Sequence, residues 1–137
     1  MRKLVLVILA SFYFLSCGKG GSVVPSIPVN FQTSFTDPRV SKLSTQGGAV
    51  IVNGYGIAGL VIYRRPDGVY VAYDRCSSYQ PEKKCAVTID DTGFTVTDPC
   101  SGSKFSLEDG TPVKAPATAV LRAYQVITTQ FTIQVIN

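Results

Sequence analysis

The side chains best suited to chemistry in this 137-residue chain lie in two short stretches, residues 76–78 and residues 98–103. Cysteine thiolates and carboxylates can ligate a metal ion, and a serine or cysteine can act as a nucleophile when a base stands beside it. The chain contains no histidine, so that base would have to be a lysine or a carboxylate. No pattern in the sequence places one beside either stretch. We therefore expect no catalytic residues and no enzymatic activity.

The second stretch, extended to Phe105, resembles a cluster-binding loop of the Rieske iron–sulfur family. That loop has the pattern Cys-Pro-x-His-Gly-Ser-x-Phe, and the other loop of the family has the pattern Cys-x-His. A Rieske centre binds one iron through two cysteines and the other iron through two histidines. The residues that match the longer pattern are Pro99, Gly102, Ser103 and Phe105. The resemblance covers about residues 47–137 and implies a Rieske-like fold.

Three of the four cluster-ligand positions that the resemblance implies hold other residues. Cys76 matches the first cysteine, but Ser78 and Ser101 stand in place of the histidines. Asp98 stands in place of the second cysteine. A serine hydroxyl must lose a proton of high pKa before it can bind iron as imidazole does. We therefore expect no metal and no cofactor, with hydrogen bonds among Asp98, Ser78 and Ser101. The alternative is a [2Fe–2S] electron-transfer protein in which Cys76 and Asp98 still ligate iron.

Three of the four cysteines, Cys76, Cys85 and Cys100, lie in the region of the resemblance. Rieske proteins of the cytochrome bc type have a disulfide between the residue after the loop proline and a cysteine beyond the first loop. This resemblance implies a disulfide between Cys85 and Cys100, which leaves Cys76 free. Because the tips of both loops should lie close together, Cys76 with Cys100 is the other possible pairing. A disulfide is expected in an oxidising compartment outside the inner membrane.

Residues 1–16 have the pattern of a secretory signal peptide, with a basic start and an apolar run over residues 4–15. Residues 14–17 resemble the bacterial lipobox, which implies cleavage before Cys17 and lipid attachment to it. An ordinary signal peptide followed by a chance cysteine, or a signal anchor, is the alternative. Because Gly18 follows the cysteine, the resemblance favours sorting to the outer membrane. The sequence thus predicts a lipoprotein of the bacterial cell envelope that faces the periplasm.

Residues 17–28 are rich in glycine, serine and proline, which predicts a flexible tether before a single β domain over residues 29–137. In that domain β-branched runs alternate with turn signals, and no stretch has a helical apolar stripe. Strands are predicted at 29–35, 47–54, 59–65, 69–74, 120–127 and 131–136. The turn at residues 66–68 joins two of them in a hairpin. We expect an all-β fold of antiparallel sheets, a small sandwich or barrel, whose two loops form a tip.

Four basic residues lie in or beside the two loops: Arg75, Lys83, Lys84 and Lys104. Loop charges are ordinarily solvated, but these also raise the hypothesis of an anionic envelope protein or glycan as partner. Cleavage before Cys17 would remove two basic residues and lower the formal net charge from +4 to +2, so we expect no nucleic-acid partner. The expected function is a binding or structural role at the membrane that carries the lipid anchor.

Overall fold

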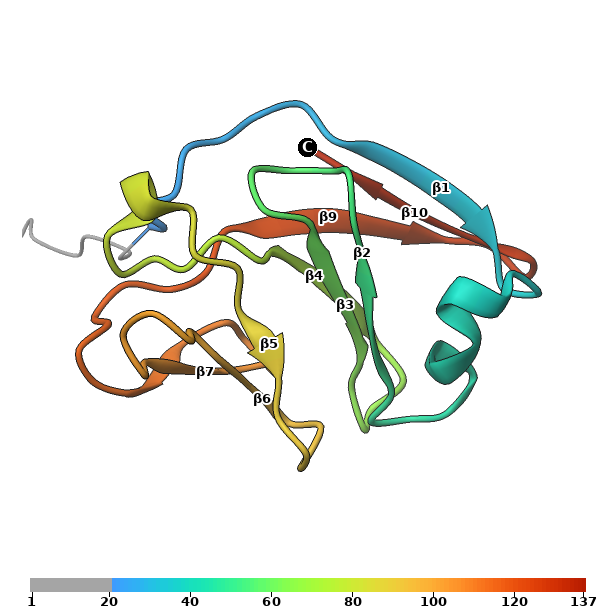
Figure 1. The fold of residues 1–137 in the computed structure, drawn as a ribbon. Helices are drawn as coiled ribbons and strands as arrows, with labels where there is room; N and C mark the ends of the chain where they lie inside the picture. The colour runs from blue at the N-terminus through green and yellow to red at the C-terminus, as the bar shows by residue number, and fades with distance from the viewer. Residues whose placement is uncertain (1–20) are drawn as a thin grey trace, which may run out of the picture.

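The computed structural model of the chain describes residues 21–137. The predicted signal peptide, residues 1–16, and the predicted lipidation site Cys17 lie outside the described residues. The described part contains ten strands in two antiparallel sheets and two short 3-10 helices. Figure 1 shows how these elements are arranged. None of its helices is long and apolar enough to cross a membrane. The prediction of an all-β fold is confirmed.

The larger sheet has six strands in the order β1-β10-β9-β4-β3-β2. Their bounds are β1 Asn30–Ser34, β10 Thr132–Ile136, β9 Ala123–Thr128, β4 Tyr70–Asp74, β3 Leu60–Arg64 and β2 Ala49–Val52. β3 and β4 form the predicted hairpin, with Gly68 at its turn in the left-handed conformation (φ 86°). The first and last strands are neighbours, because Phe31 of β1 lies opposite Val135 of β10. The two ends of the domain are thereby joined in one sheet.

Strand β3 is buried on both faces, so the sheet has a hydrophobic cluster on each side. Leu60 and Ile62 pack in one cluster, together with side chains of β1, β2 and β10. Val61 and Tyr63 pack in the other cluster, together with Val96 and the smaller sheet. Successive side chains of a strand point to opposite faces, which is why adjacent residues of β3 enter different clusters.

The smaller sheet contains four strands that the sequence analysis did not predict. They are β5 Thr88–Ile89, β6 Thr95–Thr97, β7 Lys104–Ser106 and β8 Pro112–Lys114, in the order β5-β6-β7-β8. Strands of two or three residues are too short to show an alternating pattern. Val96 and Phe105 are fully buried against the larger sheet, and the second loop connects their two strands. The smaller sheet therefore positions that loop.

The 3-10 helix η2 (Pro38–Ser44) follows β1, in a segment for which the sequence analysis predicts no element. The Asp37 carboxylate accepts a hydrogen bond from the backbone N–H of Arg39 at 2.8 Å and so caps the helix. Proline suits the first helical position because no intrahelical bond needs its missing N–H there. Val40 and Leu43 of η2 are buried in the first hydrophobic cluster.

Part of the predicted tether contacts the β domain. The side chain of Val24 is 0% exposed, and its carbonyl accepts hydrogen bonds from Nε and Nη2 of Arg122 at 3.0 and 2.6 Å. Arg122 Nη2 also donates to the carbonyl of Ser22 at 3.2 Å. The amide of Asn137 donates to the carbonyl of Ile27 at 2.7 Å. Contacts of the domain therefore begin before residue 29, the boundary that the sequence predicts.

The carboxylate of Asp74, at the end of β4, is fully buried and joins three segments of the chain. It accepts hydrogen bonds from the backbone N–H groups of Ile57, Ala58 and Cys76 and from the hydroxyl of Tyr124, at 2.6, 3.1, 2.8 and 2.8 Å. A Cβ at Gly56 would collide with this carboxylate, so glycine is required at that position. Burial and the adjacent Asp74 raise the pKa of the Tyr124 phenol, which therefore stays a donor at neutral pH.

Replacing Tyr124 with phenylalanine is expected to lower the free energy of unfolding by about 1.5–3 kcal/mol, because a hydrogen bond to a buried charge is lost. Urea unfolding of residues 21–137 measures this change. The control is Tyr63→Phe, which removes a hydroxyl that donates to Glu108 at 3.0 Å, a carboxylate whose side chain is 44% exposed. The decrease in the free energy of unfolding should be smaller in Tyr63→Phe. Equal losses in the two variants would contradict the importance of the Asp74 carboxylate.

Candidate functional site

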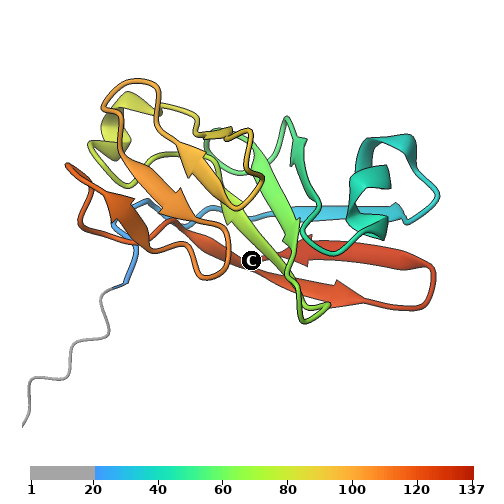
Figure 2. The same ribbon diagram turned by 90° about the horizontal axis from the view of Figure 1, so that it is seen from below.

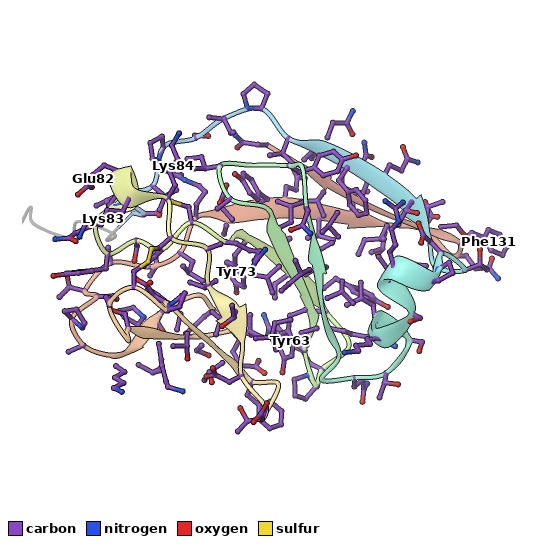
Figure 3. All side chains as sticks on the ribbon, in the orientation of Figure 1. Tyr63, Tyr73, Glu82, Lys83, Lys84 and Phe131 are labelled. Carbon is purple, nitrogen blue, oxygen red and sulfur yellow. A yellow bond between two sulfur atoms is a disulfide. The ribbon has the colours of Figure 1, made fainter. Side chains whose placement is uncertain are left out.

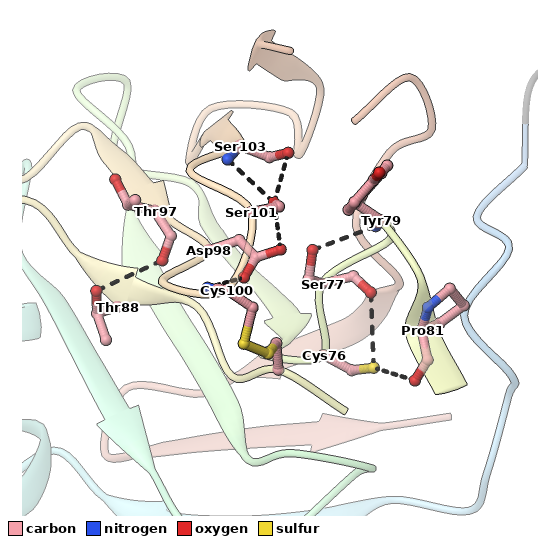
Figure 4. The surroundings of a disulfide bond; sticks show 11 residues. Cys76, Ser77, Tyr79, Pro81, Thr88, Thr97, Asp98, Cys100, Ser101 and Ser103 are labelled. Atoms are coloured by element: carbon pink, nitrogen blue, oxygen red, sulfur yellow. Dashed lines mark hydrogen bonds between the residues drawn. A yellow bond between two sulfur atoms is a disulfide. The ribbon is translucent and has the colours of Figure 1, made fainter. Parts of the chain in front are cut away.

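The two loops that the sequence analysis singled out lie together at one end of the domain, and we call residues 76–85 and 98–103 the tip. Figure 4 shows their interior. The disulfide that the resemblance implies, between Cys85 and Cys100, is present and joins the loops with a Cα–Cα distance of 6.3 Å. Cys76 is the free, buried cysteine of the described residues, which excludes the pairing of Cys76 with Cys100.

The first loop contains the one-turn 3-10 helix η3 (Pro81–Lys83). The residues on either side of η3, Gln80 and Lys84, both have a left-handed backbone with φ of 52°. This conformation is unfavourable for residues with a Cβ, so the contacts around it must hold it. One such contact is the hydrogen bond from the backbone N–H of Ser77 to the carbonyl of Cys85 at 2.8 Å, which closes the loop.

The second loop is organised around the fully buried carboxylate of Asp98. This carboxylate accepts hydrogen bonds from the backbone N–H of Cys100 at 2.8 Å and from the hydroxyl of Ser101 at 2.7 Å. The hydroxyls of Ser101 and Ser103 are hydrogen-bonded at 2.9 Å, and Ser103 Oγ accepts from the backbone N–H of Ala117 at 3.0 Å. A continuous chain of hydrogen bonds thus runs from the carboxylate to the neighbouring segment.

Burial alone would raise the pKa of Asp98, but its hydrogen bonds outweigh that effect and hold the pKa below its usual value of 3.8. The donors are the hydroxyls of Ser101 and Ser77 and the backbone N–H groups of Cys100 and Ser101. At neutral pH Asp98 is therefore a buried anion whose charge is satisfied by the loop itself.

The thiol of Cys76 is fully buried, and its Sγ lies 3.5 Å from the carbonyl oxygen of Pro81. Burial and the nearby carboxylate of Asp74 raise its pKa to about 11. The side chain is therefore a neutral thiol at neutral pH, whereas the thiolate is the form that attacks substrates and binds metals. Cys76 is poorly suited to act as a nucleophile.

The side chains at the four positions that correspond to cluster ligands are all engaged in hydrogen bonds of the domain. Asp98 and Ser101 bond each other, as the sequence predicts. Ser78 does not join them, because its hydroxyl donates to the carbonyl of Ala119 at 2.5 Å. One thiol, one carboxylate and two hydroxyls do not fit the two-cysteine, two-histidine donor set of a Rieske centre.

One other group of ligand atoms comes together at the tip. Cys85, Asp98 and Cys100 each offer a ligand atom, and these atoms lie within 4.8 Å of one another. Both sulfurs of this group are joined in the disulfide. The group also lines a pocket of about 350 Å³, together with Tyr79, Gln80, Lys83, Ser101 and Pro116. The sequence analysis placed the metal alternative on Cys76 and Asp98, so this combination was missed.

The four basic residues near the loops differ in their surroundings. Arg75 donates to the carbonyl of Val87 at 3.0 Å, and Lys104 forms an ion pair with Asp90 at 2.9 Å. Lys83 and Lys84 are exposed on η3 and the residue after it, where Figure 3 labels them. The positive charge that the tip presents to solvent therefore comes from Lys83 and Lys84, beside which the exposed Glu82 of η3 carries one negative charge.

Replacing Asp98 with asparagine is expected to reduce the loss of stability in acid. The folded protein has the lower pKa, so ionised Asp98 stabilises it above the ordinary pKa of 3.8, and this contribution is lost as the pH falls through the folded pKa. Urea unfolding of residues 21–137 from about pH 6 to about pH 2 should show wild type losing more stability than the variant. Asp91→Asn, at an exposed position, is the control and should follow wild type. Parallel curves for wild type and Asp98→Asn would contradict the assignment.

Comparison of the fold with solved structures gives a consistent result. The plasma membrane Rieske protein PetC3 of the cyanobacterium Synechocystis PCC 6803 matches 80% of this chain and 98% of its own, with a TM-score of 0.56 and 17% identity. A chain from the complex of oxygenase and ferredoxin in carbazole 1,9a-dioxygenase matches 79% of this chain and 93% of its own, with a TM-score of 0.52 and 22% identity.

A ferredoxin of Sphingomonas yanoikuyae B1 matches 70% of this chain and 93% of its own, with a TM-score of 0.50 and 17% identity. No family model and no curated protein matches the sequence. Identities this low establish the fold and nothing further. With the six-stranded sheet, the smaller sheet and the two joined loops in place, the chain contains a Rieske-like domain.

Proposed function

We propose that this protein is a lipid-anchored protein of the bacterial cell envelope whose Rieske-like domain has lost its cluster and has a binding or structural role. It is not an enzyme in this proposal. The observation that carries it is the buried carboxylate of Asp98, at the position of a ligand cysteine, which accepts hydrogen bonds from Cys100 and Ser101. The loop is thus closed by a carboxylate and its donors, where a cluster would otherwise hold it.

Two further observations support the loss of the cluster. The chain has no histidine, so neither imidazole ligand can be supplied from any part of it. The only cysteine at a ligand position, Cys76, is buried, and its Sγ contacts the carbonyl oxygen of Pro81. A hydrogen-bonded, disulfide-joined tip keeps its shape without metal, and a rigid surface of that kind suits recognition.

The lipid anchor and the location are supported by the sequence pattern of residues 1–17 and by the disulfide. The basic start, the apolar run and the cysteine at its end support lipid attachment at Cys17, and Gly18 after it favours the outer membrane, with the domain in the periplasm. A disulfide between Cys85 and Cys100 suits that oxidising compartment. The exposed Lys83 and Lys84 suit an anionic partner, either an envelope protein or a glycan.

Residues 21–137, produced in a host that assembles iron–sulfur clusters, should be folded, colourless and free of stoichiometric iron and acid-labile sulfide. The fragment begins at residue 21 because Ser22 and Val24 contact the domain. A Rieske protein with all four ligands, prepared in the same way, is the control for cluster assembly. The measurements are iron and sulfide content together with the visible absorption spectrum.

The second candidate, electron transfer through a [2Fe–2S] cluster, has one observation in its favour. The ligand atoms of Cys85, Asp98 and Cys100 lie within 4.8 Å of one another. Stoichiometric iron and sulfide in residues 21–137 would overturn the loss of the cluster. Cys76→Ser, Asp98→Ala, Cys85→Ser and Cys100→Ser variants would then identify the ligands by their loss of iron.

Attachment of lipid to Cys17 predicts that the full-length protein, expressed in a bacterium supplied with labelled palmitate, incorporates the label and fractionates with the outer membrane. The Cys17→Ser variant should incorporate none and should retain residues 1–16, since cleavage of a lipoprotein precursor follows lipid attachment. Cys76→Ser is the matched control, because Cys76 lies in the domain core and its loss should leave the label unchanged. Label in the Cys17→Ser variant would contradict the lipid anchor.

A further inference from the structure

The N-terminal segment of the described chain starts at the tip end of the molecule. Figures 1 and 2 both show the blue N-terminal segment beginning at the end that carries the loops, and the turn between β9 and β10 at the opposite end. The contacts agree with the views: Ser78 in the first loop bonds Ala119, and Arg122, three residues further, bonds Ser22 and Val24. The segment that leads back toward Cys17 therefore leaves the domain beside the tip.

The exit point is held in place by the guanidinium of Arg122. It donates two hydrogen bonds to the carbonyl of Val24 and one to the carbonyl of Ser22. Hydrogen bonds from a charged donor are stronger than those between neutral groups. The side chain of Val24 is also fully buried, so release of the segment would expose an apolar side chain as well.

The distance from this exit point to Cys17 is short. Gly21 follows Cys17 by four positions along the chain. A fully extended chain spans at most about 3.6 Å per residue, so Cys17 lies within about 14 Å of Gly21. A domain of this size has a radius of gyration of about 13 Å, which places its far end on the order of 30 Å from the exit point. An anchor at Cys17 thus keeps the tip end of the domain close to a membrane, whereas the far end is held there by no such restraint.

We propose that the tip faces and contacts the headgroup surface of the membrane that carries the protein, while the turn between β9 and β10 points away from it. This inference rests on the proposed lipid attachment at Cys17. The partner surface of Lys83 and Lys84 in this proposal is a phospholipid layer with anionic headgroups, in place of an envelope protein or a glycan.

Three side chains at this end suit such a surface. Lys83 and Lys84 are exposed and carry positive charge, which attracts anionic headgroups over a Debye length. Val23, next to the buried Val24, is 57% exposed and can contact the headgroup region. At the opposite end Phe131 is 67% exposed, and Figure 3 shows it far from η3. On this arrangement Phe131 is directed toward the periplasm.

The chain contains no tryptophan, so a single introduced tryptophan can report the distance from the membrane. The full-length lipidated protein is reconstituted in vesicles of phosphatidylcholine and phosphatidylglycerol that contain a dansyl-headgroup lipid. Glu82→Trp places the donor on η3 and leaves Lys83 and Lys84 in place, and Phe131→Trp places it at the other end. Energy transfer to dansyl should be several-fold more efficient from Glu82→Trp.

A third protein tests whether the hydrogen bonds of Arg122 hold the N-terminal segment beside the tip. In the Glu82→Trp background, Arg122→Gln removes the hydrogen bonds to Ser22 and Val24, so the domain can turn and the transfer efficiency should fall toward that of Phe131→Trp. Arg39→Gln, an exposed arginine of η2, is the matched control and should leave the efficiency unchanged. Thermal unfolding of both variants shows whether the domain remains folded.

Vesicle flotation separates the two ways in which the proposal can be wrong. Protein that does not float with the vesicles overturns the lipid anchor and with it the orientation. Protein that floats but transfers energy equally from Glu82→Trp and Phe131→Trp, or better from Phe131→Trp, overturns the orientation alone. Flotation with strong transfer from Glu82→Trp, reduced by Arg122→Gln, supports both.

Discussion

The buried carboxylate of Asp74 is the constraint on which the arrangement of this domain depends. A charge with no access to water must be met by donors, because an unpaired buried carboxylate costs several kcal/mol. Its donors come from the turn at residues 57–58, from Cys76 at the start of the first loop and from Tyr124 of β9. The first loop therefore leaves β4 in one direction, toward the segment at residues 119–122 and the N-terminal segment that Arg122 holds.

The buried carboxylate of Asp98 has the same role in the second loop. In each loop a buried carboxylate gathers backbone N–H groups and hydroxyls and so fixes the path of the chain. The disulfide between Cys85 and Cys100 then joins the two loops. Hydrogen bonds to a charged group are short and directional, and the disulfide restrains the two loops relative to each other. These interactions account for a tip in a Rieske-like fold that a metal centre need not hold together.

Sequence reasoning identified the strands whose patterns extend over five or more residues, such as β3 and β4 with the turn at Gly68. It missed β5 to β8 and η2, because two- or three-residue strands and a 3-10 turn have no periodicity of their own and form where Val96, Phe105 and Leu43 can be buried. The buried position of Asp74 could have been predicted from the sequence. Asp74 lies two residues after Ala72 and therefore on the same face of β4, the face that packs into the core. An acidic residue at such a position indicates a paired buried charge.

The sequence by itself determined the composition of the site: no histidine, serine and aspartate at ligand positions, and cysteines at the family's disulfide positions. Only the tertiary structure decided that Ser78 bonds Ala119, that Ser77 turns toward Asp98, and that Arg122 holds Val24. The physical reason is the separation of the bonded partners along the sequence. Residue identity limits which bonds are possible, whereas partners separated by 41 or 98 positions are chosen by how the sheets bring distant segments together.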